Sequence, residues 1–379
     1  MSSVSRPRRW RRFVSILGTL VVLFALTVGG AVTWVFAHAK VSTVGRTEFR
    51  NELAVPPLAT GHVRADGIRE FQLDMRSGRT EFRAGQATET WGFNGTYLGP
   101  TLRARRGEHV AVTVRNHLPE ASTVHWHGMH LPAAMDGGPH QMVQAGATWQ
   151  PQWRIEQPAA TLWYHPHPHG ATEDHVRRGL AGLFLLDDEI SETLPLPKNY
   201  GVDDLPVIVQ DVKFRGNELD SSHAIFRDVG FLGDQTMVNG TLTPYRTVGD
   251  ELIRLRLLNA STARTYTFGF ADERAFALVA TDGGCSNGRS CWTACRSRRV
   301  SEPRSSCGCA RVNEPSCAAT NSTPGSTSGP SASRAATTPS TSWNSAPPTP
   351  CARRPNCPRH WRNRRLRTVP IRPSNVASS

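Results

Sequence analysis

Two His-x-His pairs constrain the fold of this chain more than any other feature. His125-Trp126-His127 precedes Gly128, and His165-Pro166-His167 lies about forty residues later. Residues i and i+2 of an extended strand face the same side, so each pair brings two imidazoles to one place. Neutral imidazole binds copper, zinc, iron and nickel. A single pair is common on protein surfaces, but two pairs that end in glycine turns predict a site for more than one metal ion.

The residues around these pairs resemble the multicopper oxidases, a family that includes laccases, bilirubin-oxidase-like enzymes and bacterial copper-efflux oxidases. The resemblance extends from about Ala54 to Gly284. It is most specific over His125–Asp188, where the second pair is followed by Gly-Leu-Ala-Gly-Leu-Phe-Leu at 179–185. It implies copper as the cofactor and an all-β fold of cupredoxin-like Greek-key β-sandwiches.

The resemblance also implies a role for each motif residue. His125 matches a ligand of the type 2 copper, and the ligands of the type 3 copper pair would be His127, His165 and His167. Asp136 matches an acidic residue beside the cluster that helps protons reach bound oxygen. Its alternative role is an Asx-type turn ahead of two glycines.

The reaction implied by the resemblance is oxidation of a substrate coupled to reduction of O2 to water. In the family, a third cupredoxin domain supplies the remaining cluster histidines and a type 1 copper held by Cys, two His and often Met. His360 is the only histidine after His223, and the sequence contains no His-Cys-His motif. We therefore expect half of the cluster ligands and a truncated chain that is inactive alone. The alternative is a non-catalytic, membrane-anchored copper-binding module.

The basic charge is concentrated at the two ends of the chain. Residues 285–379 contain 15 Arg and 2 Glu, which equals the formal net charge of +13 of the whole chain, and five more arginines lie in Met1–Arg12. The body between them is mildly acidic, so the high pI does not indicate nucleic-acid binding. The implied partners are O2, an unknown reducing substrate and the membrane, and no partner protein is indicated.

The N-terminal segment predicts a membrane anchor. Residues 1–12 are a basic cytoplasmic segment, and Phe13–Phe36 is an uncharged run of 24 residues, which is long enough to span a bilayer. The arginines would stay in the cytoplasm and place the copper domains on the extracytoplasmic side of a single-pass cell-membrane protein. Export with signal cleavage is the alternative, because Ala37-His38-Ala39 resembles a cleavage site.

A linker over 37–51 leads into the first cupredoxin domain, expected at 52–190. Apolar residues alternate over Glu70–Met75, and Val110–Val114 is a second run with high β-propensity. Ser77-Gly78 is predicted to form a turn between strands. Trp149 and Trp153 are expected to pack in the core. The unpaired histidines are expected on the surface or beside the ligands: His109, His117, His130, His140 and His175.

A partial second cupredoxin domain is expected at 200–284. A strand begins near Leu205, and Ile253–Leu257 alternates with two arginines as a half-buried strand should. Tyr266–Phe270 repeats that pattern. In the family this middle domain is a spacer without copper ligands.

The composition changes abruptly after Gly284. Residues 285–379 hold all eight cysteines, no Phe, Tyr or Lys, and only six Ile, Leu or Val residues. So little apolar surface predicts a disordered tail. Two explanations remain open: a genuine Cys-rich tail, or an out-of-frame translation that replaces the rest of a longer sequence. We favour the frameshift because the change falls within a domain.

Overall fold

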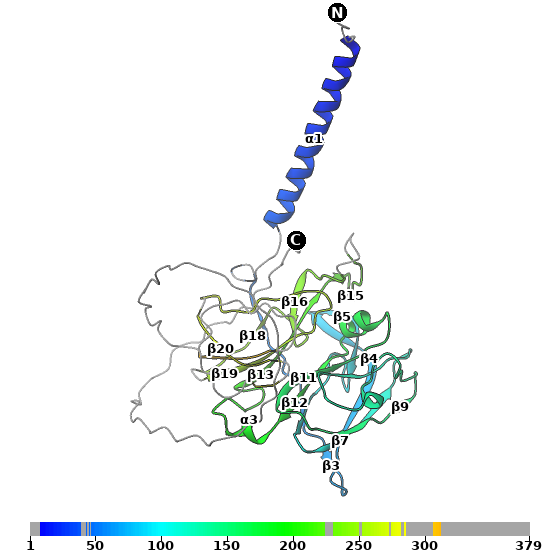
Figure 1. Cartoon of the computed structure of the whole chain (residues 1–379), viewed down its shortest axis with the longest axis vertical. Helices are drawn as coiled ribbons and strands as arrows, with labels where there is room; N and C mark the ends of the chain where they lie inside the picture. The colour runs from blue at the N-terminus through cyan, green and yellow to red at the C-terminus, as the bar shows by residue number, and fades with distance from the viewer. Residues whose placement is uncertain are drawn as a thin grey trace, which may run out of the picture. The chain divides into compact units, whose positions relative to one another are not determined.

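An N-terminal helix and a β-rich body make up the part of the chain that the computed structural model describes (Figure 1). This part comprises residues 8–38, 43, 45, 47–223, 230–249, 252–272, 274–281, 284–285 and 306–311. The predicted all-β, cupredoxin-like class is confirmed, and three sheets, named I to III below, account for most of the strands.

Helix α1 spans Arg8–His38 and contains the predicted apolar run. Within it, Arg12–Val35 has a mean hydropathy of 2.2 and is long and apolar enough to cross a membrane, a property that anchors share with signal sequences. Its three threonine hydroxyls donate to the carbonyl four residues earlier, so they need no partner outside the helix: Thr19, Thr27 and Thr33.

Sheet I has six strands and forms one layer of the first sandwich. Its main path runs β10 (Gln152–Arg154), β7 (His109–Asn116), β4 (Arg69–Arg83) and β3 (His62–Val63), with β5 (Gln86–Phe93) on β4 and β9 (Thr148–Trp149) on β7.

Sheet II has five strands and forms the facing layer. Its order is β2 (Leu58–Ala59), β6 (Thr101–Arg105), β12 (Gly182–Asp187), β11 (Ala160–His165) and β8 (His125–His127). The two histidine motifs therefore lie on neighbouring strands at one edge of this sheet.

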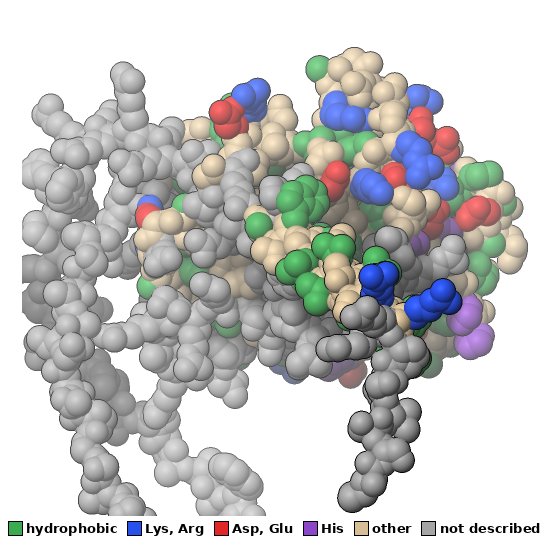
Figure 2. Space-filling view, turned by 90° about the horizontal axis from the view of Figure 1, so that it is seen from above, with side chains coloured by type: hydrophobic (Ala, Val, Ile, Leu, Met, Phe, Trp, Pro, Cys, Tyr) green, Lys and Arg blue, Asp and Glu red, His purple; other side chains and the backbone are tan. Residues whose placement is uncertain are grey.

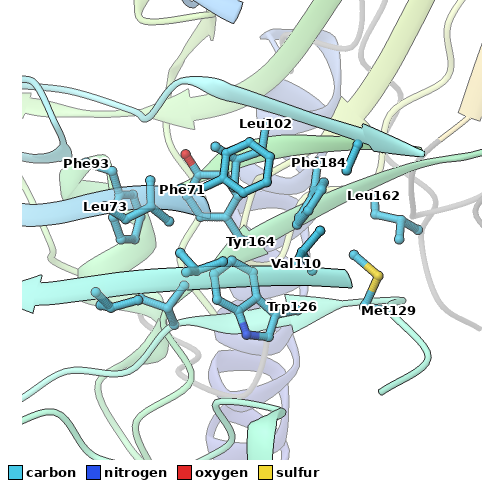
Figure 3. Packing of buried hydrophobic residues seen from close by; sticks show 14 of the residues in the cluster. Phe71, Leu73, Phe93, Leu102, Val110, Trp126, Met129, Leu162, Tyr164 and Phe184 are labelled. Atoms are coloured by element: carbon cyan, nitrogen blue, oxygen red, sulfur yellow. The ribbon is translucent and has the colours of Figure 1, made fainter. Parts of the chain in front are cut away.

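The core between sheets I and II is built from large apolar side chains of both layers (Figure 3). Phe71 of β4 meets Phe184 of β12 edge to face with ring centroids 5.8 Å apart. Trp126 packs against Trp153 at 5.2 Å, and Trp149 stacks on Trp126 at 6.4 Å, which confirms the packing role predicted for Trp149 and Trp153. Burial of these aromatic rings is a principal stabilising contribution to the sandwich.

Sheet III covers the other face of sheet II. Its order is β17 (Thr241–Leu242), β16 (Gln235–Val238), β13 (Asp204–Val212), β19 (Leu252–Asn259), β22 (Ser306–Arg311), β20 (Ala277–Thr281) and β21 (Gly284–Cys285). Leu183 and Leu185 of β12 pack against Ile208 and Leu258 of sheet III. Both faces of β12 are thus covered, which explains its continuous apolar sequence.

Two small ribbons and three short helices complete the described body. The ribbons pair β1 (Asn51–Glu52) with β18 (Pro244–Tyr245) and β14 (Phe214–Arg215) with β15 (Glu218–Leu219). The helices are η1 (Ala133–Met135), α2 (Thr172–Arg178) and α3 (Glu189–Thr193).

The turn predicted at Ser77-Gly78 is wrong, because β4 continues through both residues to Arg83. A Cβ on Gly78 would come within 2.7 Å of the Thr96 side chain. The glycine is needed there because another side chain lies directly over the strand, and not because the chain turns. The sequence pattern does not distinguish these two uses of glycine.

Two expectations for 200–284 also need correction. Tyr266–Phe270 contains only isolated bridges and is not a strand. In β19 the arginines were expected on an exposed face, yet Arg256 is 2% exposed. Its guanidinium makes a two-pronged ion pair with Asp204 of β13, at 2.7 Å on both sides, so burial of the charge is compensated.

The predicted disordered tail lies outside the described residues except at 285 and 306–311. There the structure differs from the expectation, since Ser306–Arg311 forms β22 between β19 and β20. Backbone groups of the two flanking strands are satisfied by any extended segment, whatever its side chains, which is why composition did not predict this strand.

Opposite charges alternate on the surface of the body. In Figure 2, Lys and Arg side chains lie beside Asp and Glu side chains on the visible face. Individual pairs include Arg69–Glu108 at 2.6 Å and Arg103–Asp187 at 2.6 Å. This pairing agrees with the body expected from the sequence, which has many charges of both signs and is only mildly acidic.

Candidate metal centre

The strand ladder brings the two histidine motifs together. β8 and β11 are antiparallel, with His125 opposite His165 and His127 opposite Trp163. The intervening residues Trp126 and Tyr164 point into the core between sheets I and II (Figure 3). Because side chains alternate along a strand, the histidines occupy the opposite face of sheet II.

Three imidazoles converge on one point. Ring nitrogens of His125, His127 and His165 all lie within 4.8 Å of one another. Nδ1 of His127 and Nε2 of His165 are 3.2 Å apart. Two nitrogens that bind one ion tetrahedrally at metal–nitrogen distances of about 2.0–2.1 Å are themselves about 3.3 Å apart. The His127–His165 pair therefore has the spacing that a shared metal ion requires, and a ring nitrogen of His125 lies within 4.8 Å of both.

His165 is held neutral and correctly oriented. Its Nδ1–H donates to the Pro166 carbonyl oxygen at 2.8 Å, and its ring stacks on Trp163 with centroids 3.9 Å apart. Burial, opposed by that hydrogen bond and aided by the neighbouring imidazoles, lowers its pKa to about 3. The lone pair of Nε2 is therefore free of a proton at neutral pH and faces His127.

Asp136 orients His125 through its backbone and lies beside the ring with its side chain. Its carbonyl oxygen accepts from Nδ1–H of His125 at 3.0 Å, and Oδ2 lies 3.3 Å from the same nitrogen. The same carbonyl accepts the Trp126 N–H at 3.3 Å. Nε2 of His125 is thereby left to bind a metal ion. Metal-binding histidines commonly donate the other ring N–H to a carbonyl or carboxylate in this way, which fixes the tautomer.

Gly137 allows this approach. It has φ +74°, and a Cβ there would lie 1.7 Å from the Val124 carbonyl oxygen. Gln141 closes the loop by accepting the Gly137 and Gly138 N–H groups on Oε1. The segment 136–139 that follows η1 is thus a loop, and Gly137 is needed for the close contact with the residue before β8.

His167 lies next to the cluster but outside the group of three. Its ring centroid is 5.3 Å from that of His125 and 6.0 Å from that of His165. Its side chain is exposed, whereas the other three rings are buried or half-buried. The structure therefore brings together three of the four predicted ligands and places the fourth beside them.

The donor set fits a copper ion by its chemistry. Three imidazoles, two of them with the second nitrogen bound to a carbonyl oxygen, suit copper and also zinc. Residues 52–190, which form the first sandwich and carry the site, contain no cysteine and so offer no competing thiolate. The geometry alone indicates a transition-metal site, and the choice of copper comes from the family.

The hydrogen-bond partners of His175, near the site, were not predicted. His175, expected at the surface or beside the ligands, is 1% exposed, and its two ring nitrogens lie 2.9 Å from Ser122 Oγ and 2.7 Å from Glu120 Oε1. More than fifty residues separate these partners in the sequence, so no local pattern indicates the contact.

Comparisons with known proteins agree with the site. A sequence model of the family described as "Multicopper oxidase" matches residues 74–191. The multicopper oxidase mco of Staphylococcus epidermidis is 37% identical over 247 residues, which is 65% of this chain and 55% of that protein. The cell division protein FtsP of Xenorhabdus nematophila is 41% identical over 236 residues, 62% of this chain and 48% of that protein.

Solved structures give the same result. The crystal structure of laccase from Pediococcus acidilactici superposes with a TM-score of 0.64 and 32% identity, covering 70% of this chain and 59% of the laccase. The chain spans about half the length of the curated relatives it matches. From these matches and the fold, the chain belongs, over about two thirds of its length, to the multicopper oxidase family.

Proposed function

We propose that this chain is a copper-binding protein of the multicopper oxidase type. His125, His127, His165 and His167 are its copper ligands, the first at a type 2 position and the others at type 3 positions. The observation that carries the proposal is the convergence of three ring nitrogens within 4.8 Å. Copper, when bound, supplies one-electron redox chemistry at this point.

The residues of the chain have distinct tasks at such a site. Strand pairing and the carbonyls of Pro166 and Asp136 orient the rings, and the low pKa of His165 keeps a lone pair available. Asp136 is half-buried, with a carboxylate oxygen 3.3 Å from His125 Nδ1, and we assign it to carrying protons between solvent and the site. The segments 52–190 and 200–284 are proposed as a complete and a partial cupredoxin domain.

Copper uptake by the purified full-length chain tests this proposal. We expect His127→Ala and His165→Ala each to lower bound copper, measured by mass spectrometry of the metal after removal of excess ion. His109→Ala is the matched control, because His109 is an exposed residue of β7, in the other sheet. Equal copper content in all three variants would rule out the ligand assignment.

Oxidation of a reducing substrate by O2 is a separate question. The relatives that are oxidases are about twice as long as the matched part, and four imidazoles are half of the set that the family uses. We expect copper binding without O2 consumption when a phenolic dye is offered to the full chain. Copper-dependent O2 uptake would instead establish an oxidase.

A second candidate function is a role in cell division. It is favoured by the 41% identity to a protein named for cell division. The two candidates separate in the source organism after deletion of the gene. If division defects are restored equally by the wild-type chain and by the His127→Ala variant, division does not depend on the copper site; restoration by the wild type alone links the two.

A further inference from the structure

His167 is the one motif histidine that strand pairing does not hold. β11 ends at His165, so the hydrogen-bond ladder with β8 stops two residues before it. The ring nevertheless lies 5.3 Å from that of His125. Contacts outside the sheet must therefore determine where this exposed side chain lies.

The first of these contacts ties the His167 backbone to the segment that leads into β8. The His167 N–H donates to Thr123 Oγ1 at 2.6 Å, and Thr123 is fully buried two residues before His125. A hydroxyl of one motif segment thus holds the main chain of the other, just past the last ladder bond.

The second contact comes from helix α2. The Pro168 carbonyl oxygen accepts from the Ala171 N–H at 3.3 Å and from the Thr172 hydroxyl at 2.9 Å. This tight turn joins His167 directly to the start of α2. Any displacement of α2 is therefore transmitted to His167 through only a few residues.

His175 attaches α2 to the same segment that holds Thr123. A carboxylate only accepts, so Nε2–H of His175 donates to Glu120 at 2.7 Å, and the Ser122 hydroxyl donates to Nδ1 at 2.9 Å. The ring is 1% exposed and lies edge-on to Trp91 with centroids 5.0 Å apart. The Ser122 backbone is itself fixed by two hydrogen bonds to Val143, at 3.1 and 2.7 Å.

These contacts form a bracket, defined as Glu120, Ser122, Thr123 and His175. We propose that the bracket positions His167 for the metal ion, with His175 as a positioning residue and not a ligand. The inference rests on the proposed copper site. The alternative is that His175 has only a structural role, as a hydrogen-bonded core residue whose loss would lower overall stability without affecting His167.

A double-mutant cycle distinguishes these two roles, because residues that act through one another are not additive. The copper affinity of the full-length chain is measured by competition with a chelator for the wild type, Ser122→Ala, His167→Ala and the double variant. We expect Ser122→Ala to weaken binding about 10-fold, as loss of a group that orients a ligand does. In the His167→Ala background it should cause no further loss.

Two further variants separate positioning from destabilisation. Thr123→Val removes the hydroxyl but keeps the shape of the side chain, whereas Thr123→Ser keeps the hydroxyl. Only the valine variant should therefore weaken copper binding as Ser122→Ala does. It should also shift the Cu(II) electron paramagnetic resonance spectrum toward that of His167→Ala. Tyr200→Phe is the control, because it removes partly buried hydrogen bonds to the Pro56 carbonyl and the Thr101 hydroxyl, outside the bracket. Its spectrum should match the wild type.

The outcomes are distinct. An equal loss from Ser122→Ala in both backgrounds, or no loss in either, overturns the bracket while leaving the copper site intact. A wild-type chain that takes up no copper overturns the proposed function, and the bracket with it.

Discussion

At the scale of single residues, the site depends on positions where no other amino acid has the required backbone conformation or ring nitrogen. Gly137 brings the Asp136 carbonyl against His125, and His165 supplies a lone pair because burial keeps it neutral. Neither property follows from the His-x-His spacing. The spacing predicts that imidazoles gather, whereas the surrounding backbone decides which nitrogen each ring presents.

Replacement of Gly137 by alanine should be strongly destabilising. The positive φ of +74° and a Cβ 1.7 Å from the Val124 carbonyl oxygen force the loop away from β8. We expect a loss of unfolding free energy of at least about 2 kcal/mol in denaturant titrations, with weaker copper uptake. Gly138→Ala is the matched control, because its Cβ would meet only Asp136 Oδ2, at 3.5 Å. Similar losses for both variants would contradict this account.

The His165 pKa predicts a pH-dependent stability of the metal-free protein. The folded pKa of about 3 lies below the ordinary value of 6.5, so the unfolded chain binds a proton between these values that the folded chain does not. Stability should therefore fall as the pH is lowered from about 6.5 toward 3, by up to about 1.4 kcal/mol per pH unit from this group. His165→Gln should flatten the curve of unfolding free energy against pH. An unchanged slope would refute the assignment.

His175 illustrates how a local pattern misleads at this scale. In the sequence it is an unpaired histidine, which suggests that its substitution would leave the protein unchanged and could serve as a control. Its burial and its two partners, Glu120 and Ser122, make His175→Ala a destabilising change instead. Exposed His109 is the better control for copper binding.

At the scale of elements, the first sandwich and sheet III meet at sheet II. β11 carries His165 at its end and Thr161 near its start, and Thr161 accepts from the Arg256 guanidinium at 2.7 Å. Arg256 and its partner Asp204 belong to sheet III, with exposed fractions of 2% and 0%. A buried ion pair thus joins sheet III to the strand that carries the metal site.

Removing one partner of this pair should be costly. We expect Arg256→Ala to lower the unfolding free energy by about 3–5 kcal/mol, since it leaves the Asp204 carboxylate buried without its cation. Arg105→Ala is the control, because Arg105 pairs with Glu192 at the surface and should cost less than about 1 kcal/mol. Urea titrations of the two variants compare them directly, and equal costs would show that burial of the pair is unimportant.

At the scale of the whole molecule, the chain combines an apolar N-terminal helix with a β-rich body that resembles the multicopper oxidases. By length and composition, α1 suits a membrane anchor or a signal sequence. The two differ in outcome, because an anchor keeps the copper site attached to the membrane and a cleaved signal releases it.

We expect the protein to remain in the membrane fraction. After an alkaline carbonate wash, which removes peripheral proteins, the chain should still sediment with membranes, and its N-terminal sequence should include α1. The hydrophobic span of Arg12–Val35 is the reason for retention. A soluble product that begins near Lys40 would establish cleavage instead.

The sequence by itself determined the all-β fold class, the strands β4, β7, β8, β13 and β19, and the identity of the clustered histidines. These follow from period-2 patterns and from residue types with specific chemistry, which are local properties of the chain. It did not distinguish a glycine turn from a glycine under a side chain at Gly78, nor an exposed arginine from a buried one at Arg256.

Only the tertiary structure decided which residues support the histidines. The Thr123 and Ser122 hydroxyls, the His175 ring and the Asp136 carbonyl reach the site from loops and a helix separated by up to about fifty residues of sequence. Such contacts depend on how strands pair and layers pack, and a linear pattern carries no record of them. The placement of β22 in sheet III is of the same kind, because backbone pairing needs an open strand edge and not a particular composition.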